Sequence, residues 1–250
     1  MRIALHATSE LGDRARKILS AEPDLTALGL YGHPGAAEDR RTMVIDELDG
    51  FQVLATDDPL PTGLATIAAT DGVSFVASSE LRLDDELADR FRVAEATVVG
   101  GVDLEAVAVG LASHEAGRTD GRAEITIAWT TPGSGMRSGE AVPFPDPVGA
   151  RWGRRLAPGV VAGIPVQRLE VPLAGPWAGA VAMTRGDGDR LVGVADDRAH
   201  LGAISLAAAA ITVAEGGFEP GDVAIGDRAD RYLATALRIG LGVAAFSSDA

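Results

Sequence analysis

Short apolar runs of strand length alternate with segments of helical periodicity through the first 118 residues, and this alternation constrains the fold more than any other feature. Parallel strands need a crossover, usually a helix, between each pair, and helices cover both faces of their sheet. The predicted strands are 3–5, 24–33, 51–58, 73–79 and 95–101. The predicted helices are 12–19, 61–72, 84–91 and 103–118. The sequence therefore predicts an α/β fold with a Rossmann-like, doubly wound parallel sheet.

The pattern changes after residue 120. Residues 123–133 alternate Ile125, Ile127 and Trp129 on one face, as a strand does, whereas 131–176 is rich in Gly and Pro and predicts an irregular connection. The remaining predicted elements are a strand at 169–173, a hairpin of 178–185 with 190–197, and helices at 199–217 and 227–240. This part predicts an α+β domain built on a mixed or antiparallel sheet.

Two domains are expected from this change of pattern. A Rossmann-like domain for a nucleotide or dinucleotide spans 1–120, and the α+β domain spans 121–250, with 229–250 a candidate to pack back on the first domain. Within the first domain, 38–50 predicts a short helix or lid. Because an open second sheet commonly packs against a second copy, we expect a homo-oligomer, either a dimer or a tetramer.

Composition excludes several classes of function. A formal net charge of −14 and an isoelectric point near 4.6 disfavour a nucleic-acid or membrane partner and leave a small-molecule ligand. The chain has no cysteine, and its four histidines lack metal-ligand spacing, so no metal site is expected. No apolar stretch reaches membrane-spanning length and no signal peptide is recognisable, so we expect a cytoplasmic protein. Lys17 is the only lysine and falls on a helix surface, which disfavours Schiff-base catalysis.

The first strand, turn and helix carry the candidate phosphate site, in the run IALHATSELGDRARKIL. Dinucleotide-binding turns read G-x-G-x-x-G because glycines let the backbone approach a pyrophosphate at the helix N-terminus. Here Ala7, Ser9 and Gly12 occupy the three glycine positions. The candidate cofactor-binding residues are Ala7, Thr8, Ser9, Glu10, Leu11 and Gly12. The alternative is a plain strand-to-helix turn in which Ser9 caps the helix.

Three longer stretches carry a family resemblance: VLATDDPLPTGLATIAATDGVSFVASS, VVGGVDLEAVAVGLASHEAG and FEPGDVAIGDRADRYLATALRIGL. In this order the chain resembles the two-domain NAD(P)-binding oxidoreductases of the saccharopine-dehydrogenase-like and dihydrodipicolinate-reductase-like type. The resemblance implies a Rossmann domain followed by a domain with substrate and dimer contacts. It also implies an NAD(P)-dependent oxidoreductase that acts on a small amino or carboxylic acid derivative, with NADP or NAD as cofactor.

Several residues depart from that pattern where the cofactor would bind. Glu10 adds a negative charge to the turn, and the second strand ends without the acid that binds a ribose. Arg40 and Arg41 could meet the 2′-phosphate of NADP, or they form a solvated pair. If Glu10 and Asp57 face the crevice, they would repel a pyrophosphate. This case favours the alternative function, a non-catalytic Rossmann-fold protein that acts in binding or assembly.

The catalytic candidates are acids and a histidine. Asp57 and Asp58 are either paired carboxylates for acid–base work, with Asp57 also near the cofactor, or a turn ahead of Pro59 in which an Asp accepts backbone hydrogen bonds. His114 is a candidate proton donor or a structural residue near a helix end. The loop after the strand at 123–133 offers hydroxyls and a guanidinium for an anionic substrate, or is a structural connection. Its candidate substrate-binding residues are Thr131, Ser134, Arg137 and Ser138.

Overall fold

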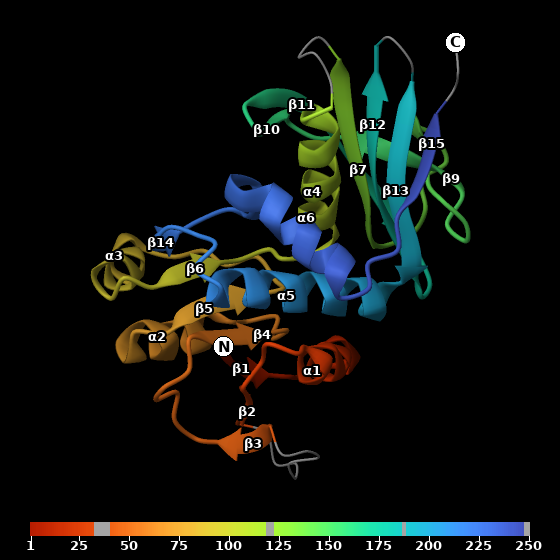
Figure 1. Cartoon of the computed structure of the whole chain (residues 1–250). Helices are drawn as coiled ribbons and strands as arrows, with labels where there is room; N and C mark the ends of the chain where they lie inside the picture. Colours follow the sequence, from red (N-terminus) through yellow and green to blue (C-terminus); the bar gives the residue numbers. More distant parts are fainter. Residues whose placement is uncertain (33–40, 119–122, 187–188, 248–250) are drawn as a thin grey trace.

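Two β-sheets organise the chain, each built mostly from one half of the sequence (Figure 1). The computed structural model describes residues 1–32, 41–118, 123–186 and 189–247. Within these residues the first sheet has seven strands, in spatial order β14 (Gly221–Asp222), β6 (Thr97–Val99), β5 (Ser74–Ala77), β4 (Val53–Thr56), β1 (Arg2–His6), β2 (Ala27–Tyr31) and β3 (Thr42–Ile45). Every neighbouring pair is parallel, as the alternation predicts.

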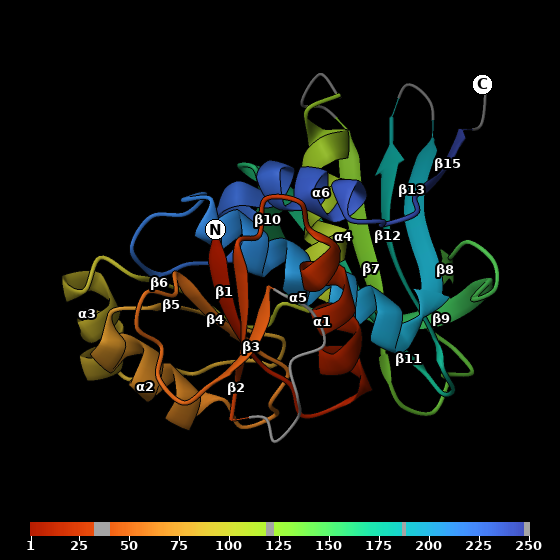
Figure 2. The same cartoon turned by 60° about the horizontal axis from the view of Figure 1, so that its bottom comes forward.

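Helices cover both faces of the first sheet (Figure 2). They are α1 (Glu10–Ala21), α2 (Thr62–Asp71), α3 (Asp85–Val93) and α5 (Arg198–Ala214). Ile3 and Leu5 of β1 are buried in the core with α1 and α5, whereas Ala4 is buried in the core with α2 and α3. This two-residue period, buried on both sides, is what a doubly wound parallel sheet requires, and the predicted fold class is confirmed.

The second sheet is mixed. In the described residues its strands run in the order β15 (Ala244–Ser247), β13 (Arg190–Asp197), β12 (Trp177–Arg185), β7 (Glu124–Pro132), β11 (Ile164–Leu173), β9 (Ala150–Arg155) and β8 (Glu140–Pro143), with β10 (Gly159–Val161) beside β11. β7 and β11 are parallel, whereas β12 and β13 form the predicted antiparallel hairpin. Helix α4 (Leu104–Ala116) covers the face that carries Ile125, Ile127 and Trp129, as their alternation predicts.

Two predictions about local structure are wrong. Residues 131–176 are not an irregular connection, because they contain the short strands β8, β9 and β10 and the whole of β11. Residues 42–45 of the expected helix or lid form the edge strand β3, paired with β2, and residues 38–40 of that segment lie outside the described residues. Strands of three to six residues between glycines and prolines are too short for a clear period of two.

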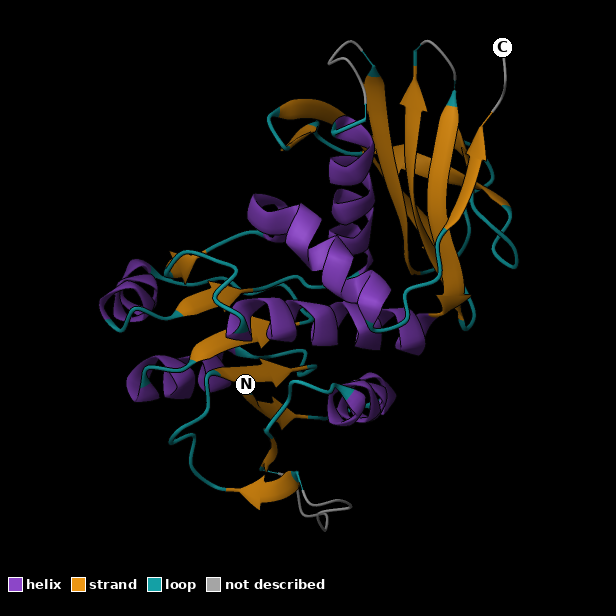
Figure 3. Ribbon diagram, in the orientation of Figure 1, coloured by secondary structure: helices purple, strands orange, loops and turns teal. Residues whose placement is uncertain are grey.

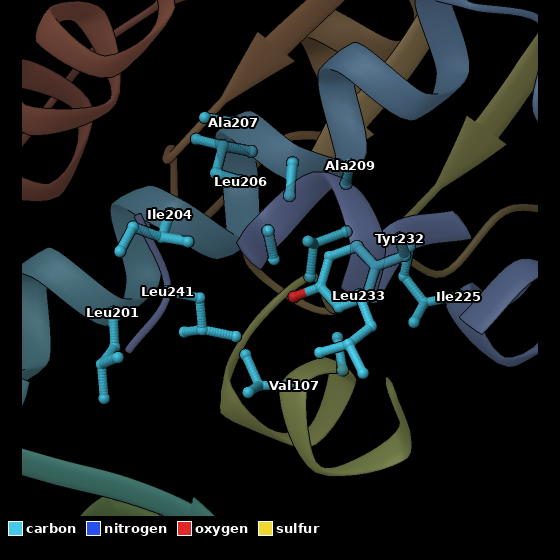
Figure 4. Packing of buried hydrophobic residues seen from close by; sticks show 14 of the residues in the cluster. Val107, Leu201, Ile204, Leu206, Ala207, Ala209, Ile225, Tyr232, Leu233 and Leu241 are labelled. Atoms are coloured by element: carbon cyan, nitrogen blue, oxygen red, sulfur yellow. The ribbon is translucent and has the colours of Figure 1, made fainter. Parts of the chain in front are cut away.

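The C-terminal elements join the two halves. Helices α4, α5 and α6 (Ala229–Arg238) gather between the sheets (Figure 3), and α6 follows the short helix η1 (Ile225–Arg228). Tyr232 lies fully buried among α4, α5 and α6, where its hydroxyl lies 2.6 Å from Ser205 Oγ (Figure 4). Burial raises the pKa of this phenol. The division at residue 120 stays a prediction. Helix α5, which packs on the first sheet, and strand β14 of that sheet come after most strands of the second sheet in sequence.

Across the residues that the structure describes, none of the helices has both the length and the apolar character needed to span a membrane.

Candidate functional site

The candidate site lies at the carboxyl edge of the first sheet, between β1 and β4. From β1 the chain builds β2 and β3 on one side, and from β4 it builds β5 and β6 on the other. This reversal is a topological switch point, where open α/β sheets bind ligands outside the carboxyl ends of their strands. The register pairs His6 with Thr56, so the residues that follow β1 and β4 lie next to each other.

The N-terminus of α1 holds an anion that the chain itself supplies, the carboxylate of Asp57. The backbone N–H of Thr8 donates to Asp57 Oδ1 at 2.6 Å, and the N–H groups of Ser9 and Gly12 donate to Oδ2 at 2.9 and 3.0 Å. The hydroxyls of Thr8 and Ser9 add bonds of 3.1 and 2.5 Å. Five donors therefore converge on one carboxylate, which is 7% exposed. We call these donors, from Thr8, Ser9 and Gly12, the anion cradle.

Local geometry explains why Gly12 is the one glycine kept in the turn. A Cβ on Gly12 would lie 2.7 Å from Ala7 Cβ and 2.8 Å from Asp57 Oδ2, closer than side-chain atoms pack. Ser9 also caps α1, because its Oγ accepts a hydrogen bond from the N–H of Leu11 at 3.2 Å. The predicted cap is therefore present and the same serine also donates to Asp57, whereas phosphate binding by this turn stays a prediction.

Glu10 and Leu11 face away from the cradle. The Glu10 carboxylate binds Arg14 Nη2 at 2.6 Å, one helical turn further along α1. Arg14 in turn binds Asp197, which caps α5, at 2.9 Å. Leu11 packs against Gly202 of α5. Of the two acids that could repel a pyrophosphate, only Asp57 points into the cradle.

Asp57 and Asp58 have different partners and do not form a carboxylate pair. Asp58 Oδ1 accepts the N–H of Leu60 at 2.8 Å, which is the turn bond predicted ahead of Pro59. Its other oxygen lies 3.9 Å from His6 Nε2. The Nδ1 atom of His6 lies 3.0 Å from the carbonyl oxygen of Tyr31, so the imidazole ring lies between the ends of β1 and β2.

Arg41 lies at the other edge of the sheet. Its Nη1 donates to the carbonyl oxygens of Glu22 and Leu25, each at 3.2 Å, before β2 begins. The ribose of a dinucleotide would lie at the carboxyl end of β2, so the structure does not bring Arg41 to the cradle. Arg40 lies outside the described residues.

The proposed substrate residues and His114 belong to the second half. Thr131 is half-buried at the end of β7, and Ser134, Arg137 and Ser138 are exposed. His114 is exposed near the end of α4, which starts beside the first sheet and runs away from it along the second (Figure 1). At 1.5 Å per residue it lies about 15 Å from the start of α4. The structure does not bring His114 together with Asp57, and the catalytic and substrate-binding roles stay predictions.

A cavity of about 430 Å³ lies further along the same carboxyl edge. Its lining includes Glu80, Leu81 and Arg82 after β5, Gly100 and Gly101 after β6, and Asp222 at the end of β14. Ser79, the residue before this lining, donates its hydroxyl to the Asp58 carbonyl at 2.7 Å. This bond joins the loop after β5, which lines the cavity, to the turn that carries Asp57.

Comparison with known proteins shows the fold. Dihydrodipicolinate reductase from Paenisporosarcina sp., bound to dipicolinate, is similar with a TM-score of 0.50 and 15% identity, over 90% of this chain and 97% of the other. Amine dehydrogenase from Mycobacterium smegmatis is similar with a TM-score of 0.57 and 11% identity, over 91% of this chain and 95% of the other. DAP dehydrogenase from C. glutamicum, in complex with DAP, is similar with a TM-score of 0.53 and 12% identity, over 93% of this chain and 95% of the other. No family model and no curated protein matches the chain.

The chain therefore has the fold of the two-domain, Rossmann-type dehydrogenases. This confirms, at the level of the fold, the resemblance to NAD(P)-binding oxidoreductases seen in the sequence. The similarity extends over both sheets, because each comparison covers at least nine tenths of the chain.

Proposed function

We propose that the protein is an NAD(P)-dependent oxidoreductase that acts on a small amino or carboxylic acid derivative. The observation that carries the proposal is the anion cradle at the switch point, where three backbone N–H groups converge within 3.0 Å of one carboxylate. They converge although two of the three glycines of the usual turn are missing. A helix N-terminus with this geometry fits one phosphate of a pyrophosphate.

The bound cofactor would supply or accept a hydride. In this proposal the cradle residues orient it, and the cavity beyond β5 and β6 offers space further along the edge. Thr131, Ser134, Arg137 and Ser138 would bind an anionic substrate and His114 would move a proton. The names of the similar structures support the substrate class, since they mention dipicolinate, DAP and a D-amino acid dehydrogenase bound to NADP+.

The first experiment is a titration of the purified protein with NADPH and with NADH, followed by nicotinamide fluorescence at low and at molar salt. Saturable binding supports the oxidoreductase and, by comparing the two ligands, decides between NADP and NAD. Absence of binding of either ligand at millimolar concentration contradicts it.

A second candidate function is a non-catalytic Rossmann-fold protein that acts in binding or assembly. The position of Asp57 favours it, because a carboxylate already occupies the place of a phosphate and carries a charge of the same sign. The same titration distinguishes the two candidates, since this second protein would bind neither dinucleotide.

Under either candidate function, we propose that the protein is cytoplasmic and forms a homodimer or homotetramer. The interface would lie on the second sheet, where the aromatic side chains of Trp152, Trp177 and Phe246 are exposed on three different strands. Light scattering after size-exclusion chromatography gives the mass in solution, and the mass of one chain, 25.6 kDa, would contradict the oligomer.

A further inference from the structure

We propose that Asp57 is a built-in occupant of the anion cradle, and that a phosphate group enters only when the Asp57 side chain leaves. This inference rests on the proposed function for the identity of the ligand, but not for the role of Asp57. It makes Asp57 the residue that determines whether the switch point accepts a dinucleotide.

The hydrogen bonds of the cradle support this role. An ionised carboxylate has two oxygens with about four acceptor positions, and five donors from the turn and helix already point at them. The N–H groups of Thr8, Ser9 and Gly12 are the groups that a phosphate would need. Asp57 therefore binds the same N–H groups that a phosphate would bind, rather than lying next to them.

Burial and charge support the same conclusion. Asp57 is 7% exposed although it is an acid at the edge of a sheet, because the turn encloses it. A pyrophosphate brought to the same N–H groups would meet a carboxylate of like charge at contact distance, and such pairs repel strongly away from water. Among the described residues none of the ion pairs involves Asp57, so in this part of the chain no cation pairs with its carboxylate.

Asp58 provides a matched control within the same turn. It is the next residue, carries the same charge, and uses its side chain for the Leu60 N–H and the His6 ring rather than for the cradle. Asp58→Asn removes one negative charge from the same edge and keeps the Oδ1 acceptor of the turn. A general electrostatic effect would appear in both variants, whereas emptying of the cradle would appear only at position 57.

The experiment compares the wild type, Asp57→Ala and Asp58→Asn in titrations with inorganic pyrophosphate and with NADPH. When a binding-competent state is rarely populated, its apparent affinity falls by that fraction, so opening the cradle raises the affinity. We expect Asp57→Ala to bind both ligands at least about tenfold more tightly than the wild type, and Asp58→Asn to match the wild type. Asp57→Asn keeps an acceptor without the charge, so its affinity for both ligands should lie between those of the wild type and Asp57→Ala. This variant replaces Asp57→Ala in the test if the Ala variant does not fold.

The outcomes separate the role of Asp57 from the proposed function. If the folded Asp57 variants bind pyrophosphate no better than the wild type, or if Asp58→Asn gains as much, the inference is overturned. If the wild type binds NADPH as tightly as the Asp57 variants do, the inference is also overturned while the oxidoreductase stands. Tighter pyrophosphate binding without NADPH binding supports the role of Asp57 and contradicts the oxidoreductase.

Discussion

Gly12 is the residue on which the close approach of α1, β1 and Asp57 depends. Replacing Gly12 with Ala places a Cβ within 2.8 Å of both Ala7 and Asp57, so one of them must shift. We expect Gly12→Ala to lower the free energy of unfolding by about 1–3 kcal/mol, the usual cost of overpacking. The control is Gly63→Ala in α2, where no atom lies within 4 Å and Ala favours the helix. Urea unfolding of both variants tests this, and equal midpoints would contradict the crowding.

The pair Asp57–Asp58 shows what local sequence can predict at the scale of a residue. The D-D-P pattern predicts an Asp that accepts backbone hydrogen bonds in a turn, and Asp58 does this with Leu60. The bonds of Asp57 join residues 45 to 49 positions apart. They depend on the register of β1 against β4, which is set by packing of the whole sheet and is not written in either segment alone. The only local sign of the cradle in the sequence is that its turn consists of small residues and residues with hydroxyl groups.

At the scale of elements, one acid holds three strands of the second sheet together. Glu140 of β8 accepts hydrogen bonds from Arg155 of β9 at 2.9 Å and from Gln167 of β11 at 2.8 Å. The bond from Arg155 lowers the pKa of Glu140, and that from Gln167 adds to the effect. Because the folded-state pKa is the lower one, the stabilisation is present above the ordinary Glu pKa and is lost as pH falls through the folded value.

We therefore expect Glu140→Gln to be less stable than the wild type at pH 7, by about 1 kcal/mol, and the difference to vanish in acid. Urea unfolding between pH 7 and pH 3 measures it. Glu86→Gln is the control, since Glu86 belongs to an exposed pair with Arg90 within α3 and should change little. A difference for Glu140→Gln that stays constant over this pH range would contradict the pairing.

Regular elements were predictable and irregular ones were not. Helix α2 was expected to end at a glycine, and Gly72 has a left-handed φ of 67° there. Helix α3 was expected to be capped, and Asp84 accepts the N–H of Leu87 at 2.8 Å. In contrast, β8 is positioned by a tertiary contact, because Phe144, just after β8, packs directly on Gly179 of β12. Such a contact determines strand position without leaving a periodic pattern in the sequence.

At the scale of the whole molecule, the two sheets share one hydrophobic core. The cluster that contains Ile3 and Leu5 of β1 also contains Ile127 of β7 and Leu206 of α5. The sequence predicts a domain boundary at residue 120 because the strand pattern changes there. The structure joins them because the long apolar helix α5 packs against α1, β4 and β12. A chain with a shared core of this kind is expected to unfold as one unit.

A single ion pair tests this cooperativity, because it joins the first helix to the last. Arg238 Nη1 of α6 lies 2.6 Å from both carboxylate oxygens of Glu22, which follows α1 and is 3% exposed. Arg238→Gln would leave a buried carboxylate without its cation, so we expect a loss of about 1–3 kcal/mol in the free energy of unfolding. Arg90→Gln, which breaks only the exposed pair with Glu86, should cost less than about 0.5 kcal/mol.

The readout uses the position of the tryptophans. All three, Trp129, Trp152 and Trp177, belong to the second half, so their fluorescence reports on the second sheet, whereas far-UV circular dichroism reports on every helix and strand. If the core is shared, Arg238→Gln lowers the urea midpoints of both signals by the same amount, because the two halves cannot unfold separately. A tryptophan transition that keeps the wild-type midpoint while the circular dichroism transition moves would mean that the two sheets unfold independently. The division at residue 120 would then mark two folding units rather than a change of sequence pattern.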